Sequence, residues 1–165
     1  MTLHRLSEYK QWKLALGLGA VSGMRSLLAP ALLSRTLARS SSHHGLLGSA
    51  GAARLLGALA LLELIADKSS RIPARTKALP LLGRALSGAL VGHAVATGAP
   101  TLPRCGTTLL GAGMATGASF VTEKLRRAFV QRYRVPDVAA GLIEDAIAIS
   151  LAWGVLRSAR GSLPR

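Results

Sequence analysis

Long apolar stretches alternate with short, mostly basic stretches along the whole chain. Five apolar stretches reach or approach the roughly 20 residues that a helix needs to cross the hydrocarbon core of a bilayer. The stretches between them, at 39–45, 68–80, 100–103 and 124–136, carry the turn and charge signals. The pattern predicts an all-α integral membrane protein, with one helical membrane domain over residues 1–165. The predicted spans are 14–34, 49–67, 83–99, 106–122 and 138–156.

The composition agrees with helices packed in lipid. Half of the 165 residues are hydrophobic, whereas 17% are charged and 4% are aromatic; soluble domains average about 25% charged residues. Soluble cores use aromatic side chains as bulky fillers, while membrane helices favour Leu towards lipid and Gly or Ala where helices touch. The alternative, a soluble helical bundle, needs polar stripes at helical spacing, which 49–67 and 138–156 lack.

The net charge of +14 raises nucleic-acid binding as a competing interpretation. The basic residues lie mostly between and beyond the apolar stretches, without the aromatic neighbours that stack bases, so we expect no nucleic-acid partner. The first apolar run is too long for a cleaved signal peptide, and further spans follow it. We therefore expect a multi-pass protein of a bacterial inner membrane.

The distribution of basic residues predicts the orientation. With five spans, thirteen basic residues fall on the side of the N-terminus and seven on the other side. Because cytoplasmic loops carry an excess of Lys and Arg, we expect the N-terminus in the cytoplasm and the C-terminus outside.

A weak internal repeat is visible. Gly19 and Gly23 in the first span match Gly113 and Gly117 in the fourth, and an Ile-Ala-Asp segment ending at 67 matches an Ile-Glu-Asp segment ending at 145. With five spans, the matched helices would run in opposite directions. This is the inverted-repeat arrangement found in many transporters.

The most informative feature is the position of the acids. Of seven Asp and Glu residues, five lie inside or at the edge of apolar stretches: Glu63, Asp67, Glu123, Glu144 and Asp145. One acid at the centre of a span costs about 2.5–3.5 kcal/mol, whereas each Leu or Ile returns about 0.3–0.6 kcal/mol. Arg25 in the first span carries a similar insertion cost. Such groups persist when they face the bundle interior, pair with each other or line water.

We therefore predict a polar centre in which Arg25 meets one of four acids: Glu63, Asp67, Glu144 and Asp145. Glu63 and Asp67 are four residues apart and share a helix face. Two interpretations remain open. The centre is a cation or proton pathway or a site for a small polar solute, or it is an internal ion-pair network that determines how the helices pack.

Other chemistry is weakly represented. Cys105 is the single cysteine, and the four His residues have no carboxylate or Cys at ligand spacing. No nucleophile elbow, phosphate-binding loop or zincin motif is present. We expect no catalytic residues, no metal and no cofactor.

Three segments together resemble a known family. They are Glu63-Leu-Ile-Ala-Asp67-Lys68, then Ile72-Pro73-Ala-Arg75-Thr76, then Gly83-Arg84-Ala-Leu-Ser-Gly88. With Gly23-Met-Arg25-Ser and the late Glu144-Asp145, they are similar to the membrane family of the domain of unknown function 4126. The chain departs from that pattern at Ser69-Ser70, where an apolar residue and a proline are expected. The resemblance implies a multi-spanning membrane protein and supplies no activity.

The leading hypothesis is a small transporter or channel, homo-oligomeric and cation- or proton-linked, in which the acids and Arg25 line a polar path. The alternative is a non-transporting membrane scaffold whose basic cytoplasmic loops bind lipids or partners. An enzyme is the third choice, because no nucleophile or metal set accompanies the carboxylates.

Overall fold

The regular elements of the chain are helices. The computed structural model describes residues 2–39, 46–66, 77–97 and 104–159, and within these ranges there are six α-helices, a short 3-10 helix and no strand. The predicted all-α class is confirmed. The elements are α1 (Thr2–Met24), α2 (Leu28–Arg39), η1 (Leu46–Gly48), α3 (Ala50–Ala66), α4 (Ala78–Thr97), α5 (Arg104–Tyr133) and α6 (Asp137–Ala159).

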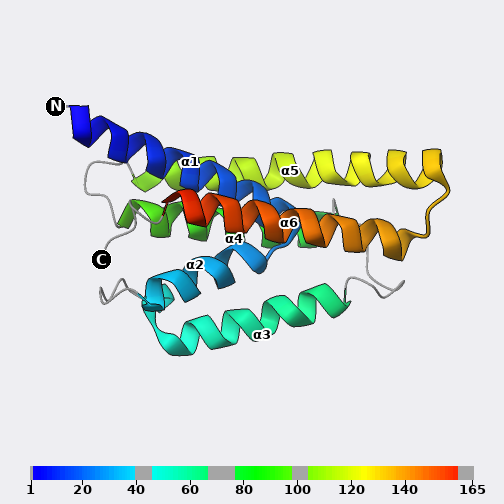
Figure 1. Ribbon diagram of the computed structural model, residues 1–165, viewed down its shortest axis with the longest axis horizontal. Helices are drawn as coiled ribbons and strands as arrows, with labels where there is room; N and C mark the ends of the chain where they lie inside the picture. Colours follow the sequence, from blue (N-terminus) through cyan, green and yellow to red (C-terminus); the bar gives the residue numbers. More distant parts are fainter. Residues whose placement is uncertain (1, 40–45, 67–76, 98–103, 160–165) are drawn as a thin grey trace.

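The helices lie roughly side by side along one long axis (Figure 1). The core centres on α1, whose Leu14, Leu18 and Val21 pack with side chains of α2, α4 and α6. Helix α3 lies on the outer side of α2 (Figure 1) and contributes only Ala60 to the buried apolar residues. Small residues bring α1, α4 and α5 close together. A Cβ on Gly88, for example, would overlap the carbonyl oxygen of Gly111.

The single span predicted over 14–34 is wrong. The chain leaves the helix after Met24, and α2 begins at Leu28 and runs back along the bundle (Figure 1). Pro30 explains why one helix cannot continue through this segment. Proline has no N–H to bond to the carbonyl of Ser26, four residues earlier, and its ring clashes with that carbonyl. In the first turn of a new helix the same proline is tolerated.

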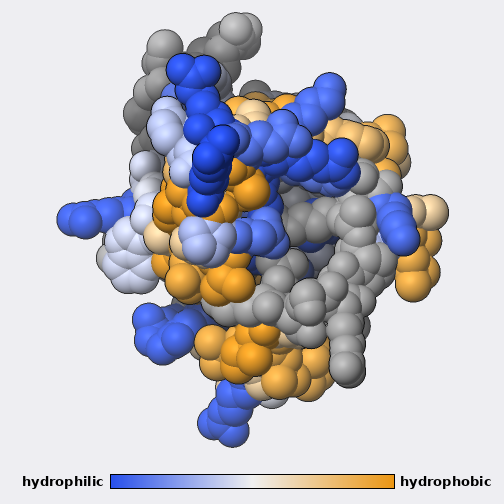
Figure 2. Space-filling model, turned by 90° about the vertical axis from the view of Figure 1, so that its right-hand side faces the viewer, coloured by the Kyte–Doolittle hydropathy of each residue, from blue (hydrophilic) through white to orange (hydrophobic). Residues whose placement is uncertain are grey.

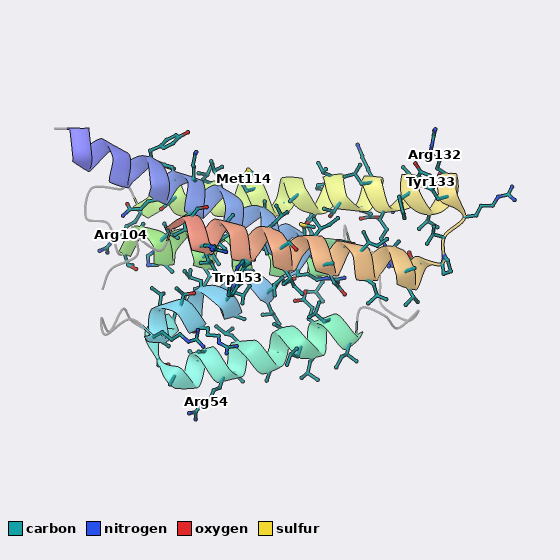
Figure 3. All side chains as sticks on the ribbon, in the orientation of Figure 1. Arg54, Arg104, Met114, Arg132, Tyr133 and Trp153 are labelled. Carbon is teal, nitrogen blue, oxygen red and sulfur yellow. The ribbon has the colours of Figure 1, made fainter. Side chains whose placement is uncertain are left out.

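The predicted spans over 49–67 and 138–156 correspond to α3 and α6, and 83–99 corresponds to α4, which begins earlier, at Ala78. The fourth span, predicted over 106–122, is too short. Helix α5 continues through the basic stretch to Tyr133, so that Arg104 and Tyr133 lie at opposite ends of the molecule (Figure 3). Residues 124–133 contain no Gly or Pro and several strong helix formers. The helix stops where Arg134 adopts a positive φ of 51°.

The reversal between α1 and α2 changes the topology. The start of α1 and the end of α6 lie at the same end of the bundle (Figure 1), whereas five continuous spans would place them at opposite ends. Helices α1 and α5 run in the same direction, not in opposite directions as the repeat required. The matched glycines also differ in surroundings. A Cβ on Gly23 would overlap α5, whereas one on Gly117 would meet nothing within 4 Å.

The surface of the described part is unusually apolar along the helices. Large hydrophobic side chains are exposed on α3, α4, α5 and α6, including Leu61 (63%), Leu79 (81%) and Leu109 (73%). Seen from the end where α5 stops, hydrophilic residues gather over the upper part and hydrophobic residues cover the lower flank, where α3 lies (Figure 2). Among the described residues, two helices, α4 and α6, are long and apolar enough by length and composition to cross a membrane.

Candidate functional site

The candidate site is the turn between α1 and α2, where Arg25 is buried and Ser26 and Leu27 are half-buried. Arg25 still donates its N–H to the carbonyl of Val21, 2.8 Å away, as the last bond of α1. The N–H of Ala31 bonds to the carbonyl of Leu27, 3.0 Å away, as an early bond of α2. Residues 25–27 therefore link two helices that meet tip to tip, and the N–H and C=O groups at the break need partners outside the helices.

Glu63 of α3 accepts hydrogen bonds from two backbone N–H groups of the turn. Its Oε1 accepts a hydrogen bond from the N–H of Ser26 and its Oε2 accepts one from the N–H of Leu27, both at 2.8 Å. The carboxylate thus caps the N-terminus of α2 with both oxygens. The positive end of a helix dipole favours a negative charge at this place. Glu63 is half-buried, so these charge-assisted bonds are only partly screened by solvent.

Serine hydroxyls donate hydrogen bonds to the backbone carbonyl groups at the break. The hydroxyl of Ser119 on α5 lies within hydrogen-bond distance of two carbonyls, that of Gly23 at 3.0 Å and that of Ala115 in its own helix at 2.8 Å. The hydroxyl of Ser87 on α4 donates to the carbonyl of Ser26. The Ser87 hydroxyl also lies 3.3 Å from that of Ser22. The glycine packing described above makes this possible, because α5 can approach Gly23 only where no Cβ intervenes.

The side chain of Arg25 forms an ion pair with Asp145 of α6. The Arg25 side chain is 1% exposed and that of Asp145 is 10% exposed, so the pair is buried in the protein. Asp145 is one of the four acids that the sequence analysis proposed as partners of Arg25, and the structure places it against the guanidinium. Charged or polar side chains from α1, α3, α4, α5 and α6 thus meet around residues 22–27.

Glu144 belongs to a neighbouring cluster. Its carboxylate lies 3.6 Å from the guanidinium of Arg126 on α5, which also holds Asp137 at 2.7 Å. Glu144 is buried, whereas the Asp137 side chain is 71% exposed. This cluster joins the C-terminal half of α5 to the start of α6. Of the other predicted residues, Arg84 is buried on α4, one turn before Ser87. Asp67, Lys68, Pro73, Arg75 and Thr76 lie outside the described residues.

Sequence reasoning missed Ser22, Ser87 and Ser119 at the turn. It also missed Arg126 and Asp137, which belong to the neighbouring cluster. The sequence does signal that a donor is needed at the place where Ser87 lies. Pro30 has no N–H, so the carbonyl of Ser26 needs another hydrogen-bond donor. No comparable signal identified Ser119. Arg126 was assigned to a loop because of the surrounding positive charge.

The comparison with known proteins places the whole of this arrangement in one family. The family model of the domain of unknown function DUF4126 matches residues 13–157. The chain belongs to the DUF4126 family. The match covers every residue of the site, from Ser22 to Asp145. Neither a curated protein nor a solved structure matches the chain. In this DUF4126 member, the motif residues Arg25, Glu63 and Asp145 meet at one buried turn.

Proposed function

We propose that this protein is embedded in a lipid bilayer and conducts protons through the buried turn. The proposed topology has four crossing helices, α3 to α6. Helices α1 and α2 form a re-entrant hairpin that enters and leaves on the side of the termini. This replaces the five continuous spans that the hydropathy pattern predicts. The apolar side chains on the outside of α3 to α6 support the embedding, since lipid tails solvate them at no cost.

The observation that carries the proposal is the break itself. Non-helical backbone at membrane depth persists only where protein or a water-filled cavity surrounds it. In transporters, discontinuous helices of this kind form the sites for ions and charged solutes. Here the break at residues 25–27 has an ion pair on one side and a carboxylate on the other.

Glu63 is the residue best placed to carry the proton. As a carboxylate it accepts two backbone N–H groups. A protonated carboxyl is a weaker acceptor, because charge-assisted bonds are about twice as strong as neutral ones. Binding a proton would therefore loosen the attachment of α3 to the tip of α2. The hydroxyls of Ser22 and Ser87 provide neighbouring groups that can both donate and accept a proton.

The test is proton flux in liposomes that contain the purified protein and a pH-sensitive dye, with a potassium gradient and valinomycin to drive the flux. We expect flux in the native protein and at least a tenfold decrease in Glu63→Gln. Asp137→Asn serves as the matched control, because it removes an exposed carboxylate outside the turn. Absence of flux in folded native protein would overturn the transport proposal and favour the scaffold alternative. Equal flux in native protein and Glu63→Gln would show that the turn is not the pathway.

A further inference from the structure

A groove between α1 and α6 lies away from the buried turn. It has a volume of about 350 Å³ and is lined by Lys13 and Leu14 of α1 and by residues of α6 from Ser150 to Ser158. Most of its wall is apolar, formed by Leu14, Leu151, Gly154 and Val155. Lys13, Leu151 and Gly154 are exposed, so the groove opens on the outer surface of the bundle.

The groove has one charged end. Helices α1 and α6 run antiparallel (Figure 1), and a Cβ on Gly17 would overlap Val155, which sets the two helices in register. Lys13 is one turn before Gly17, so it lies near Ser158 at the end of the groove that faces the chain termini. Ser150, at the other end, is eight residues from Ser158, a distance of about 12 Å along the helix.

The position of Lys13 matches that of an interfacial anchor. Its ammonium lies 4.4 Å from the ring centroid of Tyr9, which is 58% exposed. Tyr and Lys side chains gather at the level of the lipid headgroups, where an apolar body and a polar tip are both solvated. In the proposed topology, the groove therefore runs from the headgroup level at Lys13 into the hydrocarbon region at Leu151.

We propose that this groove is a binding site for one anionic phospholipid, with an acyl chain along α6 and the phosphate on Lys13. The proposal rests on the membrane embedding proposed above and does not depend on the transport activity. The apolar wall suits a hydrocarbon chain, and the cation of Lys13, at one end of the described lining, selects a headgroup with net negative charge over a zwitterionic one.

Gly154 allows the groove to be filled without disturbing the fold. A Cβ at this position would meet no heavy atom within 4 Å, so a leucine there would project into the groove. Gly57 on α3 is a matched control, because it is also a helical glycine with no atom within 4 Å of a Cβ. Lys124 on α5 is the corresponding control for Lys13, since it is an exposed lysine outside the groove.

The experiment is native mass spectrometry of protein released from vesicles of phosphatidylcholine and phosphatidylglycerol. We expect one phosphatidylglycerol retained per chain in the native protein, in Gly57→Leu and in Lys124→Gln. Gly154→Leu should lose it. Lys13→Gln should bind it about fivefold more weakly, the factor that corresponds to one basic residue near an anionic lipid surface.

Equal retention by Gly154→Leu and Gly57→Leu would overturn the groove as the site. Equal retention of the two lipids by the native protein would overturn the selection for negative charge. Both results leave the membrane embedding intact. A native protein that stays monodisperse without detergent and retains no lipid would overturn the embedding as well.

Discussion

Replacing Asp145 with Asn removes a negative charge that is ion-paired with the buried Arg25. The guanidinium is 1% exposed, so water cannot replace the lost carboxylate without a rearrangement of α1 and α6. Removing one partner of a buried ion pair costs about 3–5 kcal/mol, and an arginine at the centre of a membrane helix costs about 2.5–3.5 kcal/mol on insertion scales. The two ranges overlap near 3 kcal/mol, which we expect as the loss in the free energy of unfolding.

The double variant Arg25→Met, Asp145→Leu separates the ion pair from simple loss of packing. Replacing both partners by apolar residues of similar size is often neutral or stabilising. We therefore expect the double variant to lie within about 1 kcal/mol of the native protein, although each single change costs about 3 kcal/mol. The assay is unfolding by SDS titration in mixed micelles, followed by circular dichroism. Asp137→Asn is the control, and a loss below about 1 kcal/mol is expected for this exposed group.

Additive effects of the two single changes would refute this reasoning. They would mean that Arg25 and Asp145 stabilise the bundle independently, and that the buried pair does not hold the turn in place.

Two further predictions concern the close packing around the turn. Gly88→Ala should destabilise the protein by at least about 2 kcal/mol, because the added Cβ would overlap the backbone of α5. The control Gly57→Ala should stabilise the protein by about 0.5–1 kcal/mol. Thermal unfolding in detergent measures both changes. Ser119→Ala should cost about 1 kcal/mol because the carbonyl of Gly23 loses its donor. The control Ser158→Ala removes a hydroxyl bonded within its own helix, and its loss in the free energy of unfolding should be less than half that of Ser119→Ala. Equal losses in the two variants would contradict the role of Ser119.

Much of the fold was predictable because the hydrophobic pattern has a direct physical cause. Helices at the positions of α3, α4 and α6 follow from long Leu- and Ala-rich runs between turn signals. The inward position of Arg25, Glu144 and Asp145 follows from the cost of exposing charge among apolar surroundings. Burial of these three residues is observed.

The break in the first predicted span was not predicted, although its cause is local. The mean hydropathy over 14–34 treats this segment as one continuous helix. Pro30 alone is compatible with either a kinked helix or a reversal of the chain. The reversal depends on Glu63, Ser87 and Ser119, which come from other helices and satisfy the open backbone groups. A window on the sequence cannot show these partners, because they lie 36 to 96 residues away along the chain.

The extent of α5 was missed for a different reason. Positive charge over 124–134 resembles a cytoplasmic loop, but helix propensity there is high and no breaker occurs before Val135-Pro136. The orientation inferred from the basic residues stays a prediction, but its premise of five continuous spans does not hold, because the helix breaks between Met24 and Leu28. Arg126 was counted as a loop charge and instead joins α5 to α6 through Asp137.

The central claim is that lipid surrounds the exposed apolar faces while the charged groups gather inside. Its most direct test is the accessibility of nitroxide labels placed singly at Leu59, Leu86 and Ile147, on a Cys105→Ser background, in lipid vesicles. These residues lie near the middle of α3, α4 and α6 and are 38%, 61% and 48% exposed. We expect collisions with oxygen to exceed collisions with a water-soluble nickel chelate at all three positions, and the reverse at Arg132. Free access of the nickel chelate to all four labels would contradict the account.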